Sequence, residues 1–536
     1  MMTLRELHHC SIRTEKLEAT KDFFVGALGM EVGKRPAFPF PGYWLYAEGS
    51  PVVHLVGIDP DDPEGLVQYL GDAAMDGPTG AFDHMAFNIS EPSPLRKHLK
   101  KNKIPFRERV VPDMNLQQFF LNDPNGVTVE LNYFSTPEAP DISAKPALRE
   151  RIIGAARELI PDLQARAVKA EKARRIPKTT LNDLQDTGLW SIVQPARLGG
   201  FELDYAAILE ASYELSQGCG STGWVFVNLA SHHWMVAMFP ERGQEDVWGN
   251  DPSTRTASSV IYPAGNAKKV KGGYELSGRW PFCSGILHSK WVMVGGTVKK
   301  HTNGELPDPL IFLVPTDELE LIDTWDVAGL AATSSLDSCC ENVFVPTHRT
   351  LAANDIRGGP TPGSAVNPSP LYQLPVAALF PHLVAAPVIG MARGIVDAAC
   401  DSMSTRHSTY NKSKVALHSV PQLRLSDAMA AQDAGMTLTL ANCQEADAIS
   451  ESSGYWNVID KLRWRRDAAY SATAAVKATD QLYQAQGGAA IYKHNVMQRQ
   501  FRDMHAGVAH IGISNDINGV AYGRATLGLE PDNPMI

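Results

Sequence analysis

Apolar positions divide the chain into stretches with different periods. In residues 1–135, apolar and polar residues alternate in short runs, as in half-buried strands, with one helical spacing in each half. Residues 148–250 and 351–536 show long helical spacing, whereas residues 251–350 hold β-branched and aromatic runs bounded by Gly and Pro. The prolines of residues 136–147 predict a semi-rigid linker. The pattern predicts an α+β multidomain chain: a paired module, a linker, a helical domain, a β-domain and a C-terminal helical bundle.

The N-terminal module repeats itself. Leu7 to Ile12 predicts a strand, and an amphipathic helix through Leu17, Phe24 and Leu28 follows it. Phe82 to Phe87 predicts a second strand, which a second helical segment follows. Each unit then returns in short strands, so both have the pattern βαβββ.

Polar residues recur at matching places in the two units. His9 and His84 stand in the first strands and His54 and Glu130 in the last strands, with a spacing that agrees to within one residue. A buried unpaired carboxylate is costly, so Glu130 needs a cation or a donor. Three imidazoles and a carboxylate at one place suit a divalent first-row metal, although each could also be a hydrogen-bonded core residue. Alternation points His8 to the opposite face of the strand.

Two phrases in this module, FFVGALGMEVG and FLNDPNGVTVEL, resemble the vicinal oxygen chelate superfamily of glyoxalase I, methylmalonyl-CoA epimerase and extradiol dioxygenases. The resemblance covers nearly all of residues 4–135. It implies that His9, His84 and Glu130 hold a divalent metal, with Fe(II) favoured over Mn, Zn, Ni or Co. His54 stands where members of the superfamily differ. Both a three-ligand iron site with open positions and a four-ligand epimerase-like site therefore remain open.

Residues 278–285, G-R-W-P-F-C-S-G, lie between two short apolar runs and predict a tight corner that joins two strands. The corner carries Trp280, Phe282 and Ser284, which are unusual side chains for a turn. An aromatic wall beside one small donor suits a flat, partly polar ligand. Trp280 could equally be a packed core residue.

From Pro146 onward the chain resembles the acyl-CoA dehydrogenase superfamily, and most closely its flavin-dependent monooxygenase branch. The corner, IPKTTLNDLQDTGLWSIVQPARLGGFELDY and QLYQAQGGAAIYKHNVMQRQFRDMHAG carry the resemblance. Many relatives have glycines where Ala332 and Ser334 stand. The resemblance implies reduced flavin (FMN or FAD) as cofactor, and a homotetramer in which the Gln-Gly-Gly element crosses a subunit interface. The implied flavin contacts are Trp280, Phe282, Ser284, Thr333, Arg406, Gln486, Gly487 and Gly488.

The implied chemistry turns on the residues after the Arg-Asp element of the last helices. Dehydrogenases of the main branch have a catalytic Glu there, and this chain has none, so α-proton abstraction lacks its base. The phenol hydroxylases have a histidine in this segment, which implies His505, with His510 as the alternative. Their H-x-W element near the substrate falls on His232. The adjacent His233 cannot face the same pocket, because neighbouring helical residues are about 100° apart.

The resemblance therefore implies a two-component monooxygenase that hydroxylates a phenol-like aromatic substrate with O2, through a flavin C4a-hydroperoxide. Ser284 would donate a hydrogen bond to the flavin, and His232 or His505 would take the phenol proton. The fused module could then cleave the catechol product, as extradiol dioxygenases do. Two alternatives stay open: a flavin desaturase or oxidase with a non-catalytic or isomerase-like module, and an N-terminal module that only binds or sequesters a ligand.

Composition narrows the partners. The chain has 536 residues, too many for one core, and its net charge of −10 with dispersed Lys and Arg gives no basic arm for nucleic acid. No G-x-G-x-x-G follows a strand, so reduced flavin would come from a separate reductase.

The cysteines and the N-terminal segment indicate the cellular compartment. The 7 cysteines are scattered without a CxxC pair, and no apolar signal segment opens the chain, which favours free thiols and a cytoplasmic location. The apolar run Leu374 to Ala392 is long enough to span a membrane, but its prolines would leave carbonyls unpaired in lipid. We expect a buried helix there instead.

Overall fold

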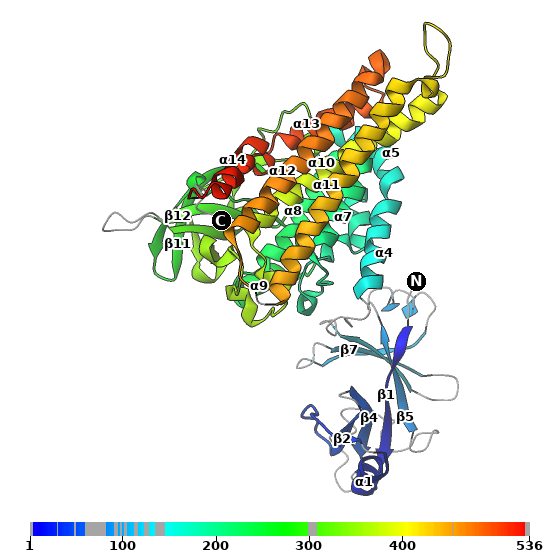
Figure 1. Cartoon of the computed structure of the whole chain (residues 1–536). Coiled ribbons are helices and arrows are strands. Elements are labelled where there is room, and N and C mark those ends of the chain that lie inside the picture. Colours follow the sequence, from blue (N-terminus) through cyan, green and yellow to red (C-terminus); the bar gives the residue numbers. More distant parts are fainter. Residues whose placement is uncertain are drawn as a thin grey trace. The chain divides into compact units, whose positions relative to one another are not determined.

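A computed structural model describes residues 4–28, 30–47, 50–58, 82–89, 95–96, 99–100, 104–111, 116–122, 128–134, 145–298, 308–452 and 454–530. The chain divides into two compact units, Met1–Glu138 and Ala139–Ile536. Unit 1 is built on one sheet, and unit 2 combines helices with a second sheet (Figure 1). The predicted α+β multidomain class is confirmed. Most of the predicted linker, and most of the second helix of the repeat, lie outside the described residues.

Unit 1 is an eight-stranded mixed sheet in the order β2-β3-β4-β1-β5-β8-β7-β6. The first strands of the two repeats, β1 and β5, pair antiparallel at the centre, and each pairs parallel with the last strand of its own repeat. This symmetry brings the matching residues of the repeat to the middle of the sheet. The elements are β1 (Leu4–Thr14), α1 (Leu17–Leu28), β2 (Glu31–Val32), β3 (Gly42–Ala47), β4 (Ser50–Gly57), β5 (Phe82–Ile89), β6 (Arg107–Val111), β7 (Leu116–Asn122) and β8 (Thr128–Phe134).

The two faces of this sheet differ in chemistry because side chains alternate along each strand. Val53 and Leu55 of β4 pack with Leu17 and Phe24 of α1 in one apolar cluster, and Phe119 and Leu131 belong to another. The residues between them in sequence, such as His54 and Glu130, occupy the opposite face. The apolar face provides the core, and the polar face is left to carry a site.

Unit 2 contains the helices α4 to α14. Helix α10 contacts α7, α12 and α13, and α11, the longest helix, packs along α12 (Figure 1). The helices are α4 (Lys145–Glu158), α5 (Ile160–Ala173), α6 (Lys178–Asp186), α7 (Tyr205–Gly218), α8 (Gly220–Val236), α9 (Glu241–Trp248), α10 (Val376–Thr405), α11 (Ser419–Glu451), α12 (Val458–Ala485), α13 (Val496–Val508) and α14 (Asn515–Thr526).

The second sheet has the order β14-β15-β11-β10-β12-β13-β16, with β9 paired to β12. β11 runs through most of the predicted corner with a register shift between Trp280 and Cys283, so the chain turns only after Cys283. The strands are β9 (Thr256–Ser259), β10 (Gly265–Val270), β11 (Gly273–Cys283), β12 (Trp291–Val298), β13 (Asp308–Pro315), β14 (Glu320–Ile322), β15 (Leu336–Pro346) and β16 (Thr350–Ala352).

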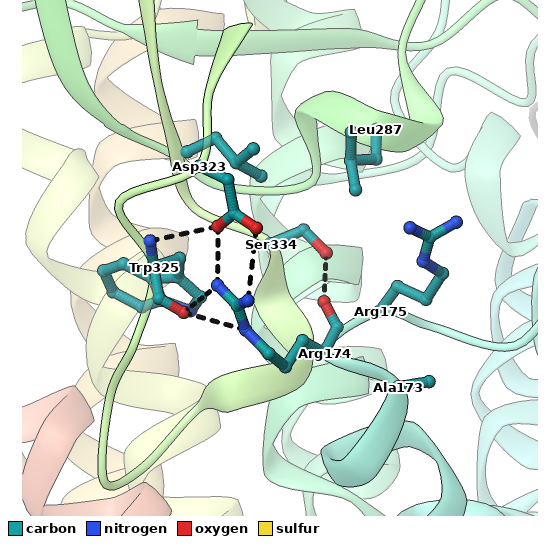
Figure 2. A pocket seen from close by; sticks show the side chains of 8 residues that line it. Ala173, Arg174, Arg175, Leu287, Asp323, Trp325 and Ser334 are labelled. Atoms are coloured by element: carbon teal, nitrogen blue, oxygen red, sulfur yellow. Dashed lines mark hydrogen bonds and ion pairs between the residues drawn. The ribbon is translucent and has the colours of Figure 1, made fainter.

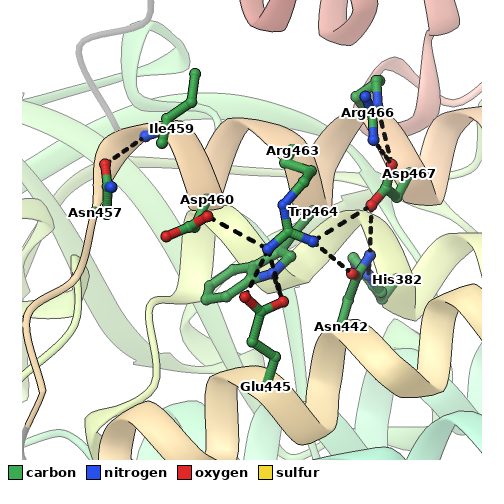
Figure 3. Close-up of polar contacts among 10 residues, drawn as sticks. All are labelled: His382, Asn442, Glu445, Asn457, Ile459, Asp460, Arg463, Trp464, Arg466 and Asp467. Carbon is green, nitrogen blue, oxygen red and sulfur yellow. Dashed lines mark hydrogen bonds and ion pairs between the residues drawn. The ribbon is translucent and has the colours of Figure 1, made fainter.

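Helix α10 is the one helix of the described chain that is long and apolar enough to cross a membrane, and 78% of its most apolar window is buried within the protein. The predicted buried helix is thus confirmed. Its His382 faces Asn442 of α11 and, through it, Asp467 of α12, which also pairs with Arg466 (Figure 3). Burial lowers the pKa of His382 to about 3, so the imidazole is neutral in this network.

All seven cysteines lie in the described part of the chain, and all are free. This confirms the expected free thiols.

Candidate functional site

Strand register gathers four sequence-predicted residues of unit 1 on one face. Across the sheet, Glu130 of β8 lies beside Ala86 of β5, which pairs with His9 of β1. Two residues away along the same pair of strands, His84 of β5 pairs with Ser11 of β1, which lies beside His54 of β4. The side chain of His8 lies outside the described residues.

Three of these side chains converge. The ligand atoms of His9, His84 and Glu130 all lie within 4.8 Å of one another. The two Nε2 atoms of His9 and His84 are 3.2 Å apart, and Glu130 Oε2 is 3.1 Å from His84 Nε2. Two imidazole lone pairs and a carboxylate that face one point form a donor set for a divalent ion. The residues therefore fit the metal that the superfamily implies.

The carboxylate of Glu130 is held in place from the far side. Gln118 donates its amide to Glu130 Oε1 at 2.6 Å and to Asn132 Oδ1 at 3.0 Å, and Arg109 in turn donates to the Gln118 carbonyl. Burial acts to raise the pKa of Glu130, but the charges of His84 and His9 and the hydrogen bonds outweigh burial and lower it to about 2. The group is ionised at neutral pH and its orientation is fixed.

His54 lies beside this cluster. Its ring stacks on His9 with the centroids 3.8 Å apart, and on Trp44 at 4.1 Å. The three-residue group does not include it. The His54 ring therefore lies between the Trp44 indole and the imidazole of the candidate ligand His9.

The second site lies in unit 2, where two loops with unusual backbones meet. Phe282 and Gly285 of the corner have φ values of 63° and 73°, and Leu330 and Ser334 of the turn before β15 have 55° and 48°. Gly285 N–H donates to the Thr333 carbonyl at 2.8 Å and joins the loops. Non-glycine residues with left-handed backbones cluster at functional sites. Ser334 takes a left-handed conformation that glycine adopts most readily.

A chain of hydroxyl groups runs through this junction. Ser284 Oγ lies 2.8 Å from Ser335 Oγ, which lies 2.7 Å from Thr333 Oγ1. The indole N–H of Trp224, from α8, donates to Ser284 Oγ at 3.3 Å. The Thr333 hydroxyl donates to the Leu330 carbonyl at 2.9 Å.

The aromatic wall of the corner is made by one residue, not two. Trp280 is fully buried, and its indole N–H donates to the Gly295 carbonyl at 2.6 Å, so it packs the core of the β-domain. Phe282 is 63% exposed and lies edge-to-face against Trp325. This corrects the expectation that both residues face the cofactor.

His232 is a core histidine. Its Nδ1 donates to the Thr256 carbonyl at 2.7 Å and its Nε2 accepts from Ser258 at 2.8 Å, which ties α8 to β9. Burial lowers its pKa to about 4 and that of His233 to about 3, so both are neutral. Both nitrogens of His232 are committed, so the predicted substrate role has no free atom.

The two candidate histidines near the C-terminus occupy different surroundings. His505 is 40% exposed and pairs with Asp480 of α12 at 2.8 Å. The ring of His510 lies 5.8 Å from that of Trp224, the residue that holds Ser284, and 5.6 Å from Phe380. The structure thus connects His510, the alternative in the sequence, to the hydroxyl chain.

Two of the implied flavin contacts, Arg406 and Gln486, lie next to each other. Arg406, at the end of α10, donates to the Gln486 carbonyl. The Gln486 amide is buried, and neither of its atoms has a hydrogen-bond partner among the described residues. Gly487 and Gly488 are exposed. A buried amide needs partners, which a ligand or a second subunit can supply.

A pocket opens behind the turn that carries Ser334 (Figure 2). Arg174 donates to Asp323 and to the Trp325 carbonyl, and its own carbonyl accepts from Ser334 Oγ at 2.6 Å. Arg174 thereby fixes both sides of the turn. Arg175 points along the pocket without a bond to the residues drawn.

Sequence reasoning missed Ser335, Trp224 and Asp503. Asp503 of α13 accepts from Leu330 N–H at 2.6 Å and holds the turn. Ser335 stands two residues after the predicted Thr333, which was a usable signal. Trp224 lies in an apolar helix where nothing in the pattern distinguishes it.

Comparison with known proteins assigns parts of both units to known families. Residues 6–131 match the Glyoxalase/Bleomycin resistance protein/Dioxygenase superfamily. Residues 147–248 and 382–515 match the N-terminal and C-terminal domains of acyl-CoA dehydrogenase. The oxygenase subunit HsaA of a flavin-dependent monooxygenase from Rhodococcus jostii (strain RHA1) is 33% identical over 379 residues, which cover 70% of this chain and 98% of that protein. This chain belongs to the flavin-dependent monooxygenase family.

Other members of the family are similar to the same extent. The oxygenase component of the FADH2-dependent resorcinol hydroxylase of Rhizobium sp. (strain MTP-10005) is 33% identical over 390 residues, 71% of this chain and 95% of that protein. The crystal structure of 3-HSA hydroxylase from Rhodococcus sp. RHA1 superposes with a TM-score of 0.69 at 33% identity, over 72% of this chain and 99% of that one. In addition to the monooxygenase part, this chain contains the glyoxalase-superfamily domain.

Proposed function

We propose that this chain is the oxygenase component of a two-component system that hydroxylates a phenol-like aromatic compound with O2. A separate reductase would supply the reduced flavin, as FMN or FAD. The observation that carries the proposal is the position of the Ser284 hydroxyl. Trp224 and Ser335 hold it by hydrogen bonds where two loops meet, and each of these loops contains residues with a left-handed backbone conformation. Similar proteins named as aromatic hydroxylase components support it.

The residues around this hydroxyl fit a flavin. Phe282 offers an exposed ring, and Thr333 and Ser284 carry hydroxyl groups. Arg406 and Gln486 to Gly488, which the resemblance implies as flavin contacts, offer further polar groups. When bound, reduced flavin supplies the oxygen-activating chemistry. The protein's part is to hold the flavin edge, exclude water and orient the aromatic ring.

His510 is the residue that we assign to the phenol oxygen. Its Nδ1 accepts from Gly512 N–H at 2.9 Å, and burial lowers its pKa to about 4, so the neutral ring carries its proton on Nε2. An Nε2–H donates a hydrogen bond to a phenol or phenolate oxygen. Such a bond stabilises the phenolate form, whose ring is the more electron-rich.

The test is to mix the protein with reduced flavin anaerobically and then add O2 and a panel of phenols. A hydroxylated product supports the proposal. Release of hydrogen peroxide alone with every phenol would contradict the proposal, and anaerobic bleaching of oxidised flavin by an acyl thioester would favour a desaturase instead.

We also propose that unit 1 binds a divalent metal, Fe(II) in the first place, through His9, His84 and Glu130. Two imidazoles and one carboxylate leave open positions at an iron site, as ring-cleaving oxygenases require. When bound, the metal supplies a chelating centre for a catechol and O2. Gln118 orients the carboxylate, and His54 with Trp44 walls the site.

This second proposal is tested by supplying Fe(II), a catechol and O2 without flavin. A yellow ring-cleavage product that is lost in His84→Ala supports it. If metal binds but no catechol consumes O2, the module performs isomerase-like chemistry. If no stoichiometric metal binds, it is a binding module.

We propose a homotetramer in the cytoplasm as the working assembly. Ile491 and Tyr492, next to the exposed Gly487 and Gly488, are 70% and 60% exposed, and a neighbouring subunit would cover them. Light scattering behind size-exclusion chromatography measures the assembly. A monomer at micromolar concentration would contradict it.

A further inference from the structure

The turn that carries His510 joins α13 to α14 and comprises residues 510–514 (the His510 turn). Inside it, Gly512 N–H donates to His510 Nδ1 at 2.9 Å. This bond leaves the imidazole proton on Nε2, the atom that we assign to the phenol oxygen. The direction of that proton therefore depends on where the backbone of the turn is held.

Gly512 packs too closely against its neighbours to carry a side chain. A Cβ atom at this position would lie 2.9 Å from Phe380 Cε1 and 3.1 Å from His510 Nδ1. Phe380, from α10, also contacts the His510 ring, with the ring centroids 5.6 Å apart. Because the ring, the turn and α10 are in close contact, a shift of the turn moves the imidazole as well.

The amide of Asn518, in α14, holds the turn from the protein side. Asn518 is 1% exposed, and its Nδ2 donates to the Gly512 carbonyl at 3.1 Å and to the Ser514 carbonyl at 2.9 Å. Its Oδ1 accepts from Arg465 Nε at 3.1 Å. Carbonyl groups only accept and a guanidinium only donates, so these partners fix which way the amide faces. Both amide hydrogens are used on the His510 turn.

Arg465, in α12, anchors this amide to α10. Its Nη1 donates to the Ala377 carbonyl in the first turn of α10. In a regular helix that carbonyl would accept from the N–H four residues later, but the residue there is Pro381, which has no N–H. The proline thus leaves an acceptor for Arg465, and the guanidinium joins α10 to Asn518.

We propose that Asn518 and Arg465 are positioning residues for the hydroxylation, which hold the His510 turn so that His510 Nε2–H faces the phenol oxygen. The inference rests on the proposed function, in which His510 donates to that oxygen. Both residues act through the backbone of the turn, at Gly512 and Ser514. Without them the turn relaxes and the donor is misplaced, although the imidazole itself is still present.

The experiment gives each full-length variant reduced flavin, O2 and the phenol that the wild-type protein hydroxylates best, and measures the ratio of hydroxylated product to hydrogen peroxide. The two electrons of reduced flavin reduce O2 in either case, so a misplaced donor lowers this ratio. Asn518→Asp keeps the shape and the acceptor for Arg465 but removes both amide hydrogens. We expect the ratio to fall about tenfold, with the dissociation constant of the flavin changed by less than about twofold.

The matched control is Asn367→Asp. Asn367 is 3% exposed, donates to the Ala237 carbonyl at 2.8 Å and accepts from Arg197 Nε at 2.8 Å, so it has the same kinds of partner outside the His510 turn. We expect its ratio of product to peroxide to equal that of the wild-type protein, even where its melting temperature falls.

A double variant tests whether Asn518 acts through His510. Once His510→Asn has removed the imidazole, its placement no longer matters. Adding Asn518→Asp to His510→Asn should therefore change the ratio by less than about twofold, so that the two effects are not additive.

Additive effects in the double variant, or an equal fall in Asn367→Asp, would show a merely structural role and overturn the inference. A wild-type protein that hydroxylates no phenol would overturn the proposed function, and the inference with it. If Asn518→Asp does not fold, Arg465→Lys decides the matter, because lysine keeps the charge but cannot reach Asn518 and Ala377 together. Its ratio should fall in the wild-type background and stay unchanged in His510→Asn.

Discussion

The two sites are built by opposite means. In unit 1, paired strands place His9, His84 and Glu130 on one face, and none of the three residues has a left-handed backbone, although the β1–β5 pairing shifts register next to His9. In unit 2, residues with left-handed backbones bring Ser284 and Thr333 together through irregular loops. A repeat of strands fixes a set of candidate metal ligands, whereas two interlocked loops hold the hydroxyl groups that we propose to face a flavin. The first type is visible in sequence periodicity, and the second is visible only in part.

The largest expected effect separates the sites. Glu130→Gln keeps the shape and the hydrogen bond from Gln118, but it removes the anionic ligand. We expect metal affinity to fall by at least about 100-fold, measured by calorimetry and elemental analysis, with flavin binding unchanged. Loss of flavin binding in the same variant would contradict two independent sites.

A matched pair of histidines sharpens the flavin side. His510→Asn removes the donor that we assign to the phenol oxygen, so hydroxylation should fall by roughly 10- to 100-fold at unchanged flavin affinity. His505→Asn removes only an exposed ion pair with Asp480 and should stay within about twofold of wild type. The opposite ranking of the two variants would return the role to His505.

Neighbouring glutamines on β7 test the supporting bonds of the metal site. Gln118→Leu leaves Glu130 without its donor, and we expect about tenfold weaker metal binding. Gln117 points to the other face of the strand and donates to Glu108, so Gln117→Leu is the control. Equal effects of the two variants would show that orientation of the carboxylate does not matter.

The smallest expected effect concerns pH. Burial raises the pKa of Asp503 from 3.8 to about 6. A raised carboxyl pKa stabilises the fold fully below pH 3.8, and this contribution is lost as pH rises through about 6. Asp503→Asn keeps an oxygen for Leu330 N–H without the buried charge.

The variant should therefore melt on the order of 2 °C above wild type at pH 8 and show a smaller gain at pH 5. Thermal unfolding followed by circular dichroism at both pH values measures the difference. A constant offset at the two pH values would contradict a titrating Asp503.

Sequence predicted the architecture because its signals are periodic. The paired βαβββ units, the β-domain and the buried α10 all follow from apolar spacing, and α10 is confirmed by its burial. The ligand set of unit 1 followed from the repeat, since a residue's face in a strand is fixed by its parity.

Side chains in irregular segments were harder to place. Trp280 and Phe282 are two residues apart in β11, yet the register shift after Trp280 leaves one in the core and one at the surface. His232 and His510 were both plausible, and only packing shows that β9 satisfies the first while the second contacts Trp224. Such distinctions depend on tertiary contacts that no local pattern carries.

The central claim is that unit 2 turns a phenol into a catechol and unit 1 opens the catechol ring. Its most direct test is one reaction in ¹⁸O2 with phenolic substrate, reduced flavin and Fe(II), quenched rapidly and read by mass spectrometry. Hydroxylation places one oxygen atom of O2 in the product and ring cleavage places two. The account predicts a cleaved product with three labels in wild type and an uncleaved catechol with one label in Glu130→Gln. A product with no label, or the same single-label catechol from both proteins in the presence of iron, would contradict it.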